Sequence, residues 1–245
     1  MPTKPDHLKQ YIKEILLPKT GEDGFQLYKS KELLRVKGPF VDQISFQLSQ
    51  YGSKTFYVHY QKNLIAYPLL NISSYRVGHR LSNNSDNGDE SEWRGSESDE
   101  AKKAIISVSD AYDKIIEPWF ATVSSVAEYV FEYFANNHDA TTKSLEIAVA
   151  FAYAGKRNPA WWICSDLLSE GIESDKVILA ACKEYIDVDE IEKQKEALQN
   201  EHYAKYHAAM ADLAVPESRH DNINSLLNHW RQQNIEKFKL EKFIV

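Results

Sequence analysis

The chain has 245 residues, of which 43% are hydrophobic and 27% charged, values typical of globular proteins and not of disordered or fibrous ones. No apolar run approaches the ~20 residues that a membrane span needs, and residues 1–13 lack the apolar core of a signal peptide, so we expect a cytoplasmic protein without a membrane-bound part. The net charge of −7 is uneven, because residues 1–80 hold 12 Lys and Arg against 6 Asp and Glu; an excess this small without an arginine cluster argues against nucleic acid as partner.

The first part of the chain predicts a helix followed by strands. Apolar side chains recur at helical spacing over residues 6–17, with lysines and a glutamate between them, which predicts an amphipathic helix that Pro18 ends. Short extended runs follow at residues 25–28 and 33–36. We expect these two runs to be strands of a sheet.

The strongest pattern is a pair of alternating segments at residues 41–49 and 56–61. Apolar and polar side chains alternate in both segments, which is typical of half-buried strands, and residues 50–54 connect them as a hairpin. The apolar face is expected to pack on the first helix, while amides and hydroxyls line the other face. This polar face is a predicted binding surface, and its candidate residues are Gln43, Ser45, Gln47 and His59. Arg80, which comes from outside the hairpin, is a fifth candidate.

An acidic segment at residues 83–100 predicts a loop. It holds seven acidic residues and one arginine around a single aromatic, too little apolar content for a packed element. One large aromatic among acids suits docking onto a basic surface, with the aromatic as anchor. A solvated linker without a binding role is the alternative. The candidate contact residues of this loop are Asp89, Glu90, Glu92 and Trp93.

The remainder of the chain is predicted to be helical. Apolar stripes at residues 104–116 and 123–134 predict two helices that meet at Pro118. A segment that is apolar on nearly all sides, residues 145–153, and a last helix around residues 223–230 predict a second core.

Together these elements predict an α+β fold, with a small antiparallel sheet packed on helices and a mostly α-helical C-terminal region. We expect two domains. Residues 1–136 form the α+β domain with the acidic loop at 83–100, and residues 137–245 form the helical domain.

A search for catalytic motifs finds none in the sequence. It has no phosphate-binding glycine motif, nucleophile elbow or metalloprotease helix. His202 and His207 are five residues apart, which aims them away from a shared metal ion, and Cys164 and Cys182 lie in apolar helical patterns typical of buried thiols. We therefore predict no catalytic residue, no metal site and no cofactor.

Several short segments, taken in their order along the chain, resemble an uncharacterised bacterial domain family catalogued as a domain of unknown function, over roughly residues 5–135. Families of this kind frequently contain members that resemble immunity proteins, which bind toxins and block them. The resemblance therefore implies a non-enzymatic role, and no catalytic residue carries over from it. The segment after Gly24-Phe25 lacks the family's usual basic-glycine run. The segments are Ile15-Leu16-x-Pro18, Gly24-Phe25, Gln43-x-x-Phe46-Gln47-x-Ser49-x-Tyr51, Arg76 to Leu81, Trp93 and Glu117-Pro118-Trp119-Phe120.

Three hypotheses of function follow. The leading one is a non-enzymatic protein-binding protein, an antitoxin-like immunity protein that occludes a basic toxin with its polar hairpin face or acidic loop. The second is an enzyme or nucleic-acid-processing protein whose site lies between sheet and helices and uses His59, Gln47 and Arg80. The third is a helical adaptor with a groove lined by Tyr203, Tyr206 and Met210.

Overall fold

A computed structural model describes most of the chain in two compact units. The first unit comprises Met1–Ile65, Asn71–Asn137 and Ile235–Val245, and the second comprises Ala66–Leu70 and His138–Asn234. Residues 137–245, predicted as one helical domain, are thus divided, because their last part belongs to the first unit. The residues that the structure describes are 6–49, 55–67, 70–72, 77–82, 92–95, 97–136, 145–155 and 220–245.

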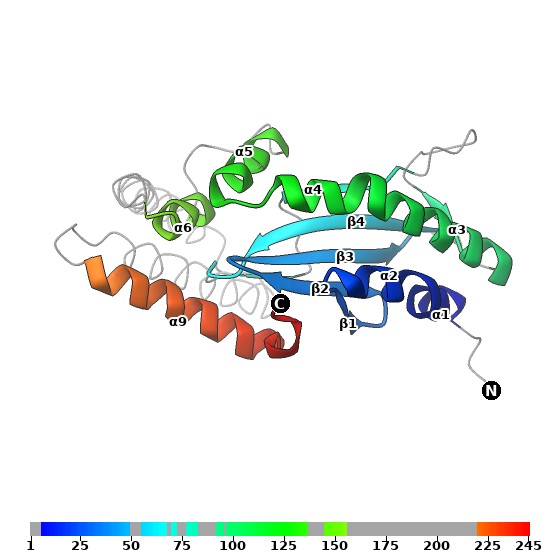
Figure 1. The fold of residues 1–245 in the computed structure, drawn as a ribbon, viewed down its shortest axis with the longest axis horizontal. Helices are drawn as coiled ribbons and strands as arrows, with labels where there is room; N and C mark the ends of the chain where they lie inside the picture. Colours follow the sequence, from blue (N-terminus) through cyan, green and yellow to red (C-terminus); the bar gives the residue numbers. More distant parts are fainter. Residues whose placement is uncertain are drawn as a thin grey trace, which may run out of the picture. The chain divides into compact units, whose positions relative to one another are not determined.

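A six-stranded antiparallel sheet forms the centre of the first unit and, with the surrounding helices, confirms the predicted α+β class (Figure 1). The strands follow the order β1-β2-β3-β4-β5, and β6 pairs with β4 next to β5. The predicted strands at residues 25–28 and 33–36 and the predicted hairpin are all present. The strands are β1 (Gln26–Lys29), β2 (Glu32–Lys37), β3 (Phe40–Leu48), β4 (Thr55–Leu64), β5 (Val77–Arg80) and β6 (Trp93–Arg94).

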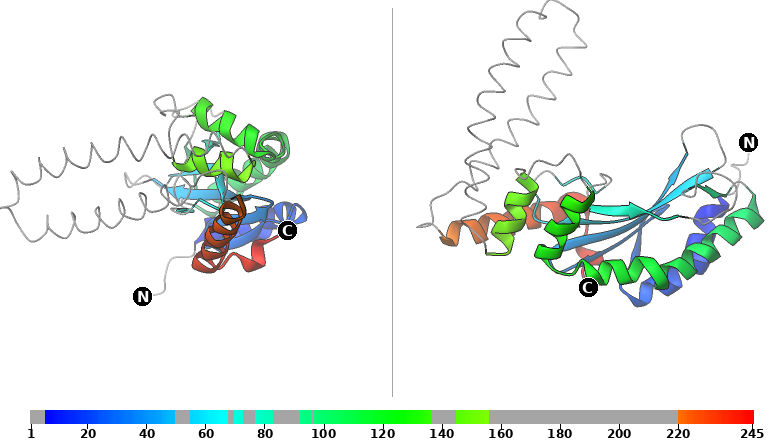
Figure 2. Two further views of the ribbon diagram at one scale, coloured as in Figure 1. Left: turned by 90° about the vertical axis from the view of Figure 1, so that its left-hand side faces the viewer. Right: turned by 90° about the horizontal axis from the view of Figure 1, so that it is seen from above.

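Two long helical segments lie across one face of this sheet (Figures 1 and 2). The first consists of α1 (His7–Tyr11), the π-helical turn η1 (Ile12–Leu16) and α2 (Leu17–Glu22). The second consists of α3 (Ser98–Ala111), the π-helical turn η2 (Tyr112–Ile116) and α4 (Glu117–Thr122).

Both segments continue through a proline, so the predicted ends at Pro18 and Pro118 are wrong. Proline has no N–H to donate and its ring clashes with the carbonyl four residues earlier, which breaks a regular α-helix. Each helix avoids the clash by a wider π turn immediately before the proline. In η2 the N–H of Glu117 bonds to the carbonyl of Tyr112, five residues earlier. The chain direction changes instead after Thr122, and α5 (Val126–Asn136) follows, with Glu128 and Ser125 bonded as a capping box.

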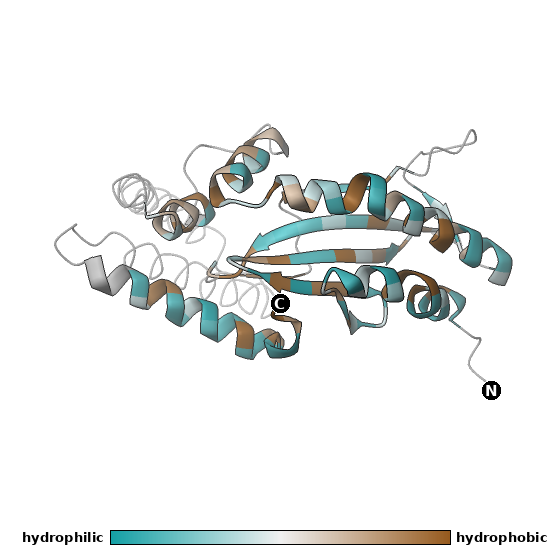
Figure 3. Cartoon of the chain, viewed as in Figure 1, coloured by the Kyte–Doolittle hydropathy of each residue, from teal (hydrophilic) through white to brown (hydrophobic). Residues whose placement is uncertain are grey.

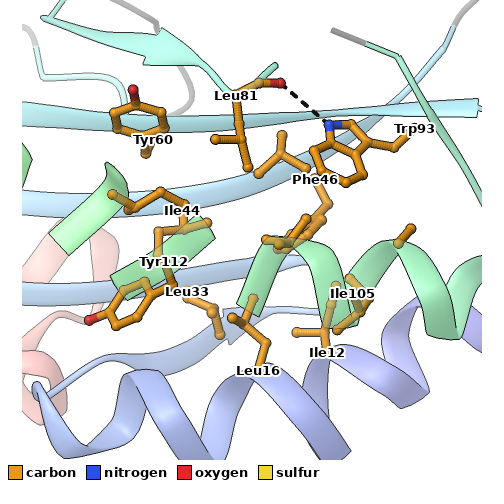
Figure 4. Packing of buried hydrophobic residues seen from close by; sticks show 14 of the residues in the cluster. Ile12, Leu16, Leu33, Ile44, Phe46, Tyr60, Leu81, Trp93, Ile105 and Tyr112 are labelled. Carbon is orange, nitrogen blue, oxygen red and sulfur yellow. Dashed lines mark hydrogen bonds between the residues drawn. The ribbon is translucent and has the colours of Figure 1, made fainter. Parts of the chain in front are cut away.

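The hydrophobic core lies between these helices and the sheet (Figure 4). Brown apolar positions lie among teal polar ones along β2 and β3 (Figure 3). The prediction that the first helix covers the apolar side of the hairpin is confirmed, and α3 covers the same side. Core residues labelled in the close-up are Ile12, Leu16, Leu33, Ile44, Phe46, Tyr60, Leu81, Trp93, Ile105 and Tyr112.

Trp93 belongs to this core, so its predicted role as an exposed anchor is wrong. It is only 6% exposed and stacks on Phe56 with 6.5 Å between ring centroids. Its indole N–H donates to the carbonyl oxygen of Leu81 at 3.4 Å (Figure 4). Residues 93–94 form β6 and α3 begins at Ser98, inside the segment predicted as a loop at 83–100. A single tryptophan is enough apolar surface to dock this segment on the sheet.

The end of the chain also packs on the first unit. After α9 (His220–Phe238) and the short turn η4 (Glu241–Phe243), Ile244 forms a parallel bridge with Val36, and the N–H of Val245 donates to the carbonyl of Val36 at 3.1 Å. Gly24 has a φ of 88°, and a Cβ there would lie 2.5 Å from Cγ1 of Val245. Only glycine fits at position 24 without displacing the chain end.

The described part of the second unit contains α6 (Leu145–Tyr153) and most of α9, which confirms the apolar helix and the last helix predicted there. Leu227 and Trp230 are buried, and the side-chain amide of Asn234 donates to the carbonyl of Tyr67 at 2.8 Å. No helix in the described ranges is both long and apolar enough to cross a membrane. Predictions that fall outside the described residues concern Asp89, Glu90, Cys164, Cys182, His202, Tyr203, Tyr206, His207 and Met210.

Candidate functional site

The sheet has a second face, opposite to the one that α1–α4 cover. Strand alternation points Val58 and Tyr60 toward the helices, and therefore Tyr57, His59 and Gln61 to the other side. The strand register places four polar side chains in one row across β2 to β5, and these are Glu32, Ser45, His59 and Arg80.

The four candidate residues predicted on the hairpin, and Arg80 from β5, thus share this side of the sheet. Gln43 and Gln47 lie on it too, two residues to either side of Ser45 along β3. We call this side the polar face. It comprises Glu32, Gln43, Ser45, Gln47, Tyr57, His59, Gln61 and Arg80.

A chain of hydrogen-bonded amides forms part of the polar face. The amide nitrogen of Gln61 donates to the carbonyl of Ile72 at 2.9 Å and to Oε1 of Gln43 at 2.6 Å. Gln43 in turn donates to Oε2 of Glu32 at 3.2 Å. Gln43 is 1% and Gln61 3% exposed, so both amides are fixed in place. Each amide thus donates to the next group, from Gln61 to Gln43 and from Gln43 to the carboxylate of Glu32.

A hollow of about 500 Å³ opens next to this carboxylate. The two amides, Glu32, Ser45 and Gln47 line it from the sheet, and the turn between β1 and β2 lines it from the side. Leu48, at 56% exposure, adds an apolar group. The complete lining is Lys29, Ser30, Lys31, Glu32, Gln43, Ser45, Phe46, Gln47, Leu48 and Gln61.

A second group of polar side chains surrounds Tyr57. The guanidinium of Arg80 lies 4.2 Å from the centre of the Tyr57 ring, and the Tyr57 hydroxyl donates to Glu92. Glu92, predicted as part of a docking loop, therefore contributes to the polar face. The His59 and Tyr57 rings are 6.4 Å apart. Burial, reinforced by the positive charge of Arg80, lowers the pKa of His59 to about 4, so its imidazole is neutral at pH 7.

The helix-covered face holds charges of its own, which the sequence pattern did not reveal. Arg35 donates to Oδ2 of Asp42 at 2.8 Å, and Nζ of Lys62 lies 3.2 Å from Oδ1 of Asp42. Glu117 pairs with Arg35 at 3.1 Å, and the hydroxyl of Tyr112 lies 2.7 Å from Oδ2 of Asp23 and 3.1 Å from Oε2 of Glu117. Arg35, Asp42 and Lys62 occupy core-facing positions of their strands, where an apolar residue is the usual choice.

Burial lowers the pKa of Lys62, and the attraction of Asp42 only partly offsets this effect. Burial also acts to lower the pKa of Arg35, but the carboxylates of Asp42 and Glu117 outweigh it, so that pKa is raised. Lys62 donates to the carbonyl of Phe120 at 3.2 Å, so it contacts the covering helix. We interpret this buried cluster (Arg35, Asp42, Lys62, Tyr112 and Glu117) as a structural network that ties helix α4 to the sheet.

His79 of β5 pairs with a residue of α5. Its Nε2 lies 2.7 Å from Oε1 of Glu132, and the indole N–H of Trp119 donates to the same oxygen at 3.2 Å. Within the described residues, no group of three His, Cys, Asp or Glu side chains could hold a metal ion.

The strands of the sheet and α2, α3, η2 and α4 all fall within one segment, from Leu17 to Thr122. Residues 17–122 match DUF4304, a domain of unknown function. The DUF4304 segment thus contains the polar face, the hollow and the buried cluster. The match confirms the predicted resemblance to an uncharacterised domain family. No curated protein and no solved structure matches the chain at a significant level.

Proposed function

We propose that the chain is a cytoplasmic, non-enzymatic binding protein that recognises another protein through its polar face. In this proposal it acts as an antitoxin-like immunity protein and occludes a basic toxin. One observation carries the proposal: side chains of four neighbouring strands converge in register on one face, next to a hollow lined by hydrogen-bonding groups. Groups held on strands are well placed for recognition because they need little ordering on binding.

The position of this face supports binding over the enzymatic alternative. The enzyme hypothesis requires a site between sheet and helices that uses His59, Gln47 and Arg80. Their strand positions point these side chains away from the helices. The space between sheet and helices holds the hydrophobic core and the buried cluster.

The charge of the chain supports a basic partner. The net charge of −7 comes from residues 81–245, because residues 1–80 hold 12 basic and 6 acidic residues; the acidic part attracts cationic proteins over distances comparable to the Debye length and accelerates their association. Association should therefore slow as the salt concentration rises. On the polar face, the carboxylate of Glu32 can meet a positive charge locally, because it lies beside the hollow.

The proposal is tested by capture from the native lysate with the full-length chain as bait, at low and high salt, followed by mass spectrometry. Two variants make the test specific for the polar face. Gln47→Arg places a bulky cation on it, and Gln10→Arg makes the same change on the exposed side of α1. We expect one stoichiometric, salt-sensitive, basic partner whose capture falls about tenfold or more with Gln47→Arg, equivalent to about 1.4 kcal/mol or more.

Capture by the Gln10→Arg variant should stay near the wild-type level. Equal capture by both variants would place the interface elsewhere on the chain. If no stoichiometric partner is captured at either salt concentration, a metabolite screen for the enzymatic alternative becomes the next experiment. An activity assay of the captured protein, with and without the chain, then tests whether binding inhibits a toxin.

A further inference from the structure

We infer that the hollow beside Glu32 is an arginine-binding site, which takes the guanidinium of an arginine side chain presented by the partner protein. The inference deepens the proposed function and rests on it for the source of the arginine. The site itself can be tested with a small arginine derivative and no partner.

The hydrogen-bond directions call for a ligand that donates. The amide of Gln61 donates to Gln43, and Gln43 donates to Oε2 of Glu32. The acceptor oxygen of Gln43 is thus already used, and its nitrogen points to Glu32. The network therefore ends on the carboxylate of Glu32, and the two buried amides hold this carboxylate in its orientation. A carboxylate held in place in this way binds a cationic donor at little cost in ordering.

The lysines of the hollow leave room for such a cation. Nζ of Lys29 lies 3.7 Å from Oε1 of Glu32, longer than a hydrogen bond, and the Lys29 side chain is 55% exposed. Lys31 is directed elsewhere, because its ammonium pairs with Asp6 at 2.9 Å. A guanidinium that bonds Oε1 directly would replace a weak, solvated contact.

The lining favours arginine over lysine. A guanidinium has five N–H donors in a planar fork, which matches a carboxylate and still leaves donors for neighbouring acceptors. Ser45 and Gln47 supply a hydroxyl and an amide oxygen in the same hollow. The volume of about 500 Å³ is sufficient for one long side chain.

The experiment uses the full-length, ¹⁵N-labelled chain and N-acetyl-arginine amide as the probe, followed by two-dimensional NMR. We expect dose-dependent shifts confined to the amides of residues 29–32 and 43–48, with a Kd on the order of millimolar for one such contact. N-acetyl-glutamine amide, which has a similar stem and no charge, should cause no comparable shifts.

Three variants should change the affinity for the arginine probe in different directions or by different amounts. Glu32→Gln keeps an acceptor for Gln43 and removes the charge, and it should weaken binding about fivefold or more. Glu22→Gln removes an exposed charge at the end of α2 and should change binding less than twofold. Lys29→Ala removes the competing ammonium and should strengthen binding about twofold. If the hollow bound anions instead, Lys29→Ala would weaken the binding of its ligand.

Three results would overturn the inference: no shifts with the arginine probe, equal affinity of wild type and Glu32→Gln, or shifts of the same amides by inorganic phosphate that Lys29→Ala abolishes. The ¹⁵N spectra of the free variants show whether each one is folded. Failure of the arginine site leaves the capture experiment unaffected, and a failed capture experiment leaves the NMR result valid. The two proposals can therefore fail separately.

Discussion

The two faces of the sheet differ in how their charged and polar side chains are paired. On the helix-covered face, Asp42 is fully buried and paired with both Arg35 and Lys62 under helix α4. On the polar face, the chain of amides ends on Glu32 beside a hollow, and the cation nearest to it, Lys29, is 3.7 Å away. Both faces contain charged groups in hydrogen bonds, so burial and pairing alone do not identify a site. The useful distinction is whether a carboxylate already has its cationic partners, as Asp42 does, or faces a hollow with one weak partner, as Glu32 does.

The largest expected effect concerns the buried cluster. Asp42→Ala leaves the Arg35 and Lys62 charges buried without their shared counter-ion, and we expect it to lower the free energy of unfolding by about 4 kcal/mol. Asp113→Ala, which removes an exposed partner of Lys19, should cost less than about 1 kcal/mol. Urea unfolding followed by circular dichroism measures both. A small effect of Asp42→Ala would mean that water reaches the cluster.

A second substitution separates core from interface. Trp93→Ala removes a buried ring that stacks on Phe56 and should lower the free energy of unfolding by about 3 kcal/mol. Under conditions where the variant stays folded, its affinity for the partner should be close to that of wild type. A stable variant with lost affinity would restore Trp93 as an anchor and contradict its assignment to the core.

The polar face predicts a pH dependence through His59. Its folded pKa of about 4 lies below the unfolded value of 6.5, so between these pH values the unfolded chain binds the extra proton. The contribution of His59 to the free energy of unfolding is fully present above pH 6.5 and is lost as the pH falls toward 4. We expect His59→Gln to reduce this acid-induced loss by about 2 kcal/mol, allowing for partial solvent screening. Urea titrations at pH 7, 5.5 and 4 test it, and parallel curves for both proteins would contradict it.

The smallest expected effect tests the contact between Gly24 and the chain end. Gly24→Ala combines backbone strain at φ 88° with a clash against Val245, whereas Gly38→Ala has φ 59° and no atom within 4 Å of the added Cβ. We expect costs of about 2 and about 1 kcal/mol respectively. Thermal unfolding measures the difference. The difference should disappear in a Val245→Gly background, and its persistence would show that Val245 is not the obstacle.

The sequence predicts the parts of this fold that rest on periodicity. Alternation in β3 and β4 depends on which side chains face the core, so the hairpin and the shared side of Gln43, Ser45, Gln47 and His59 follow from it, whereas Arg80 joins them through the pairing of β5 with β4. Short strands carry no such signal: β5 has four residues, and its Gly78 is required because a Cβ would lie 2.3 Å from the carbonyl oxygen of Tyr60.

Other features depend on distant partners that periodicity does not reveal. Glu32 joins the candidate site only because β2 pairs with β3, and it gave no signal of its own. Arg35 and Lys62 interrupt apolar positions of their strands, which is the one sign of a buried ion cluster that the sequence offers. Trp93 was misassigned because its acidic neighbours outweighed a single aromatic residue in the composition of the segment.

The two π turns have a consequence for how this domain can change over time. Each π turn accommodates one residue more than an α-helical turn would at the same place. Deletion of one residue within Tyr112–Ile116 would therefore restore a regular α-helical turn and leave α4 in nearly the same orientation relative to α3. Phe120 would keep its core-facing side and Glu117 would stay near Arg35, but the ring of Pro118 would then meet the carbonyl four residues earlier. Such a deletion should be better tolerated together with Pro118→Ala, whereas a deletion inside α3 would rotate everything after it by about 100°.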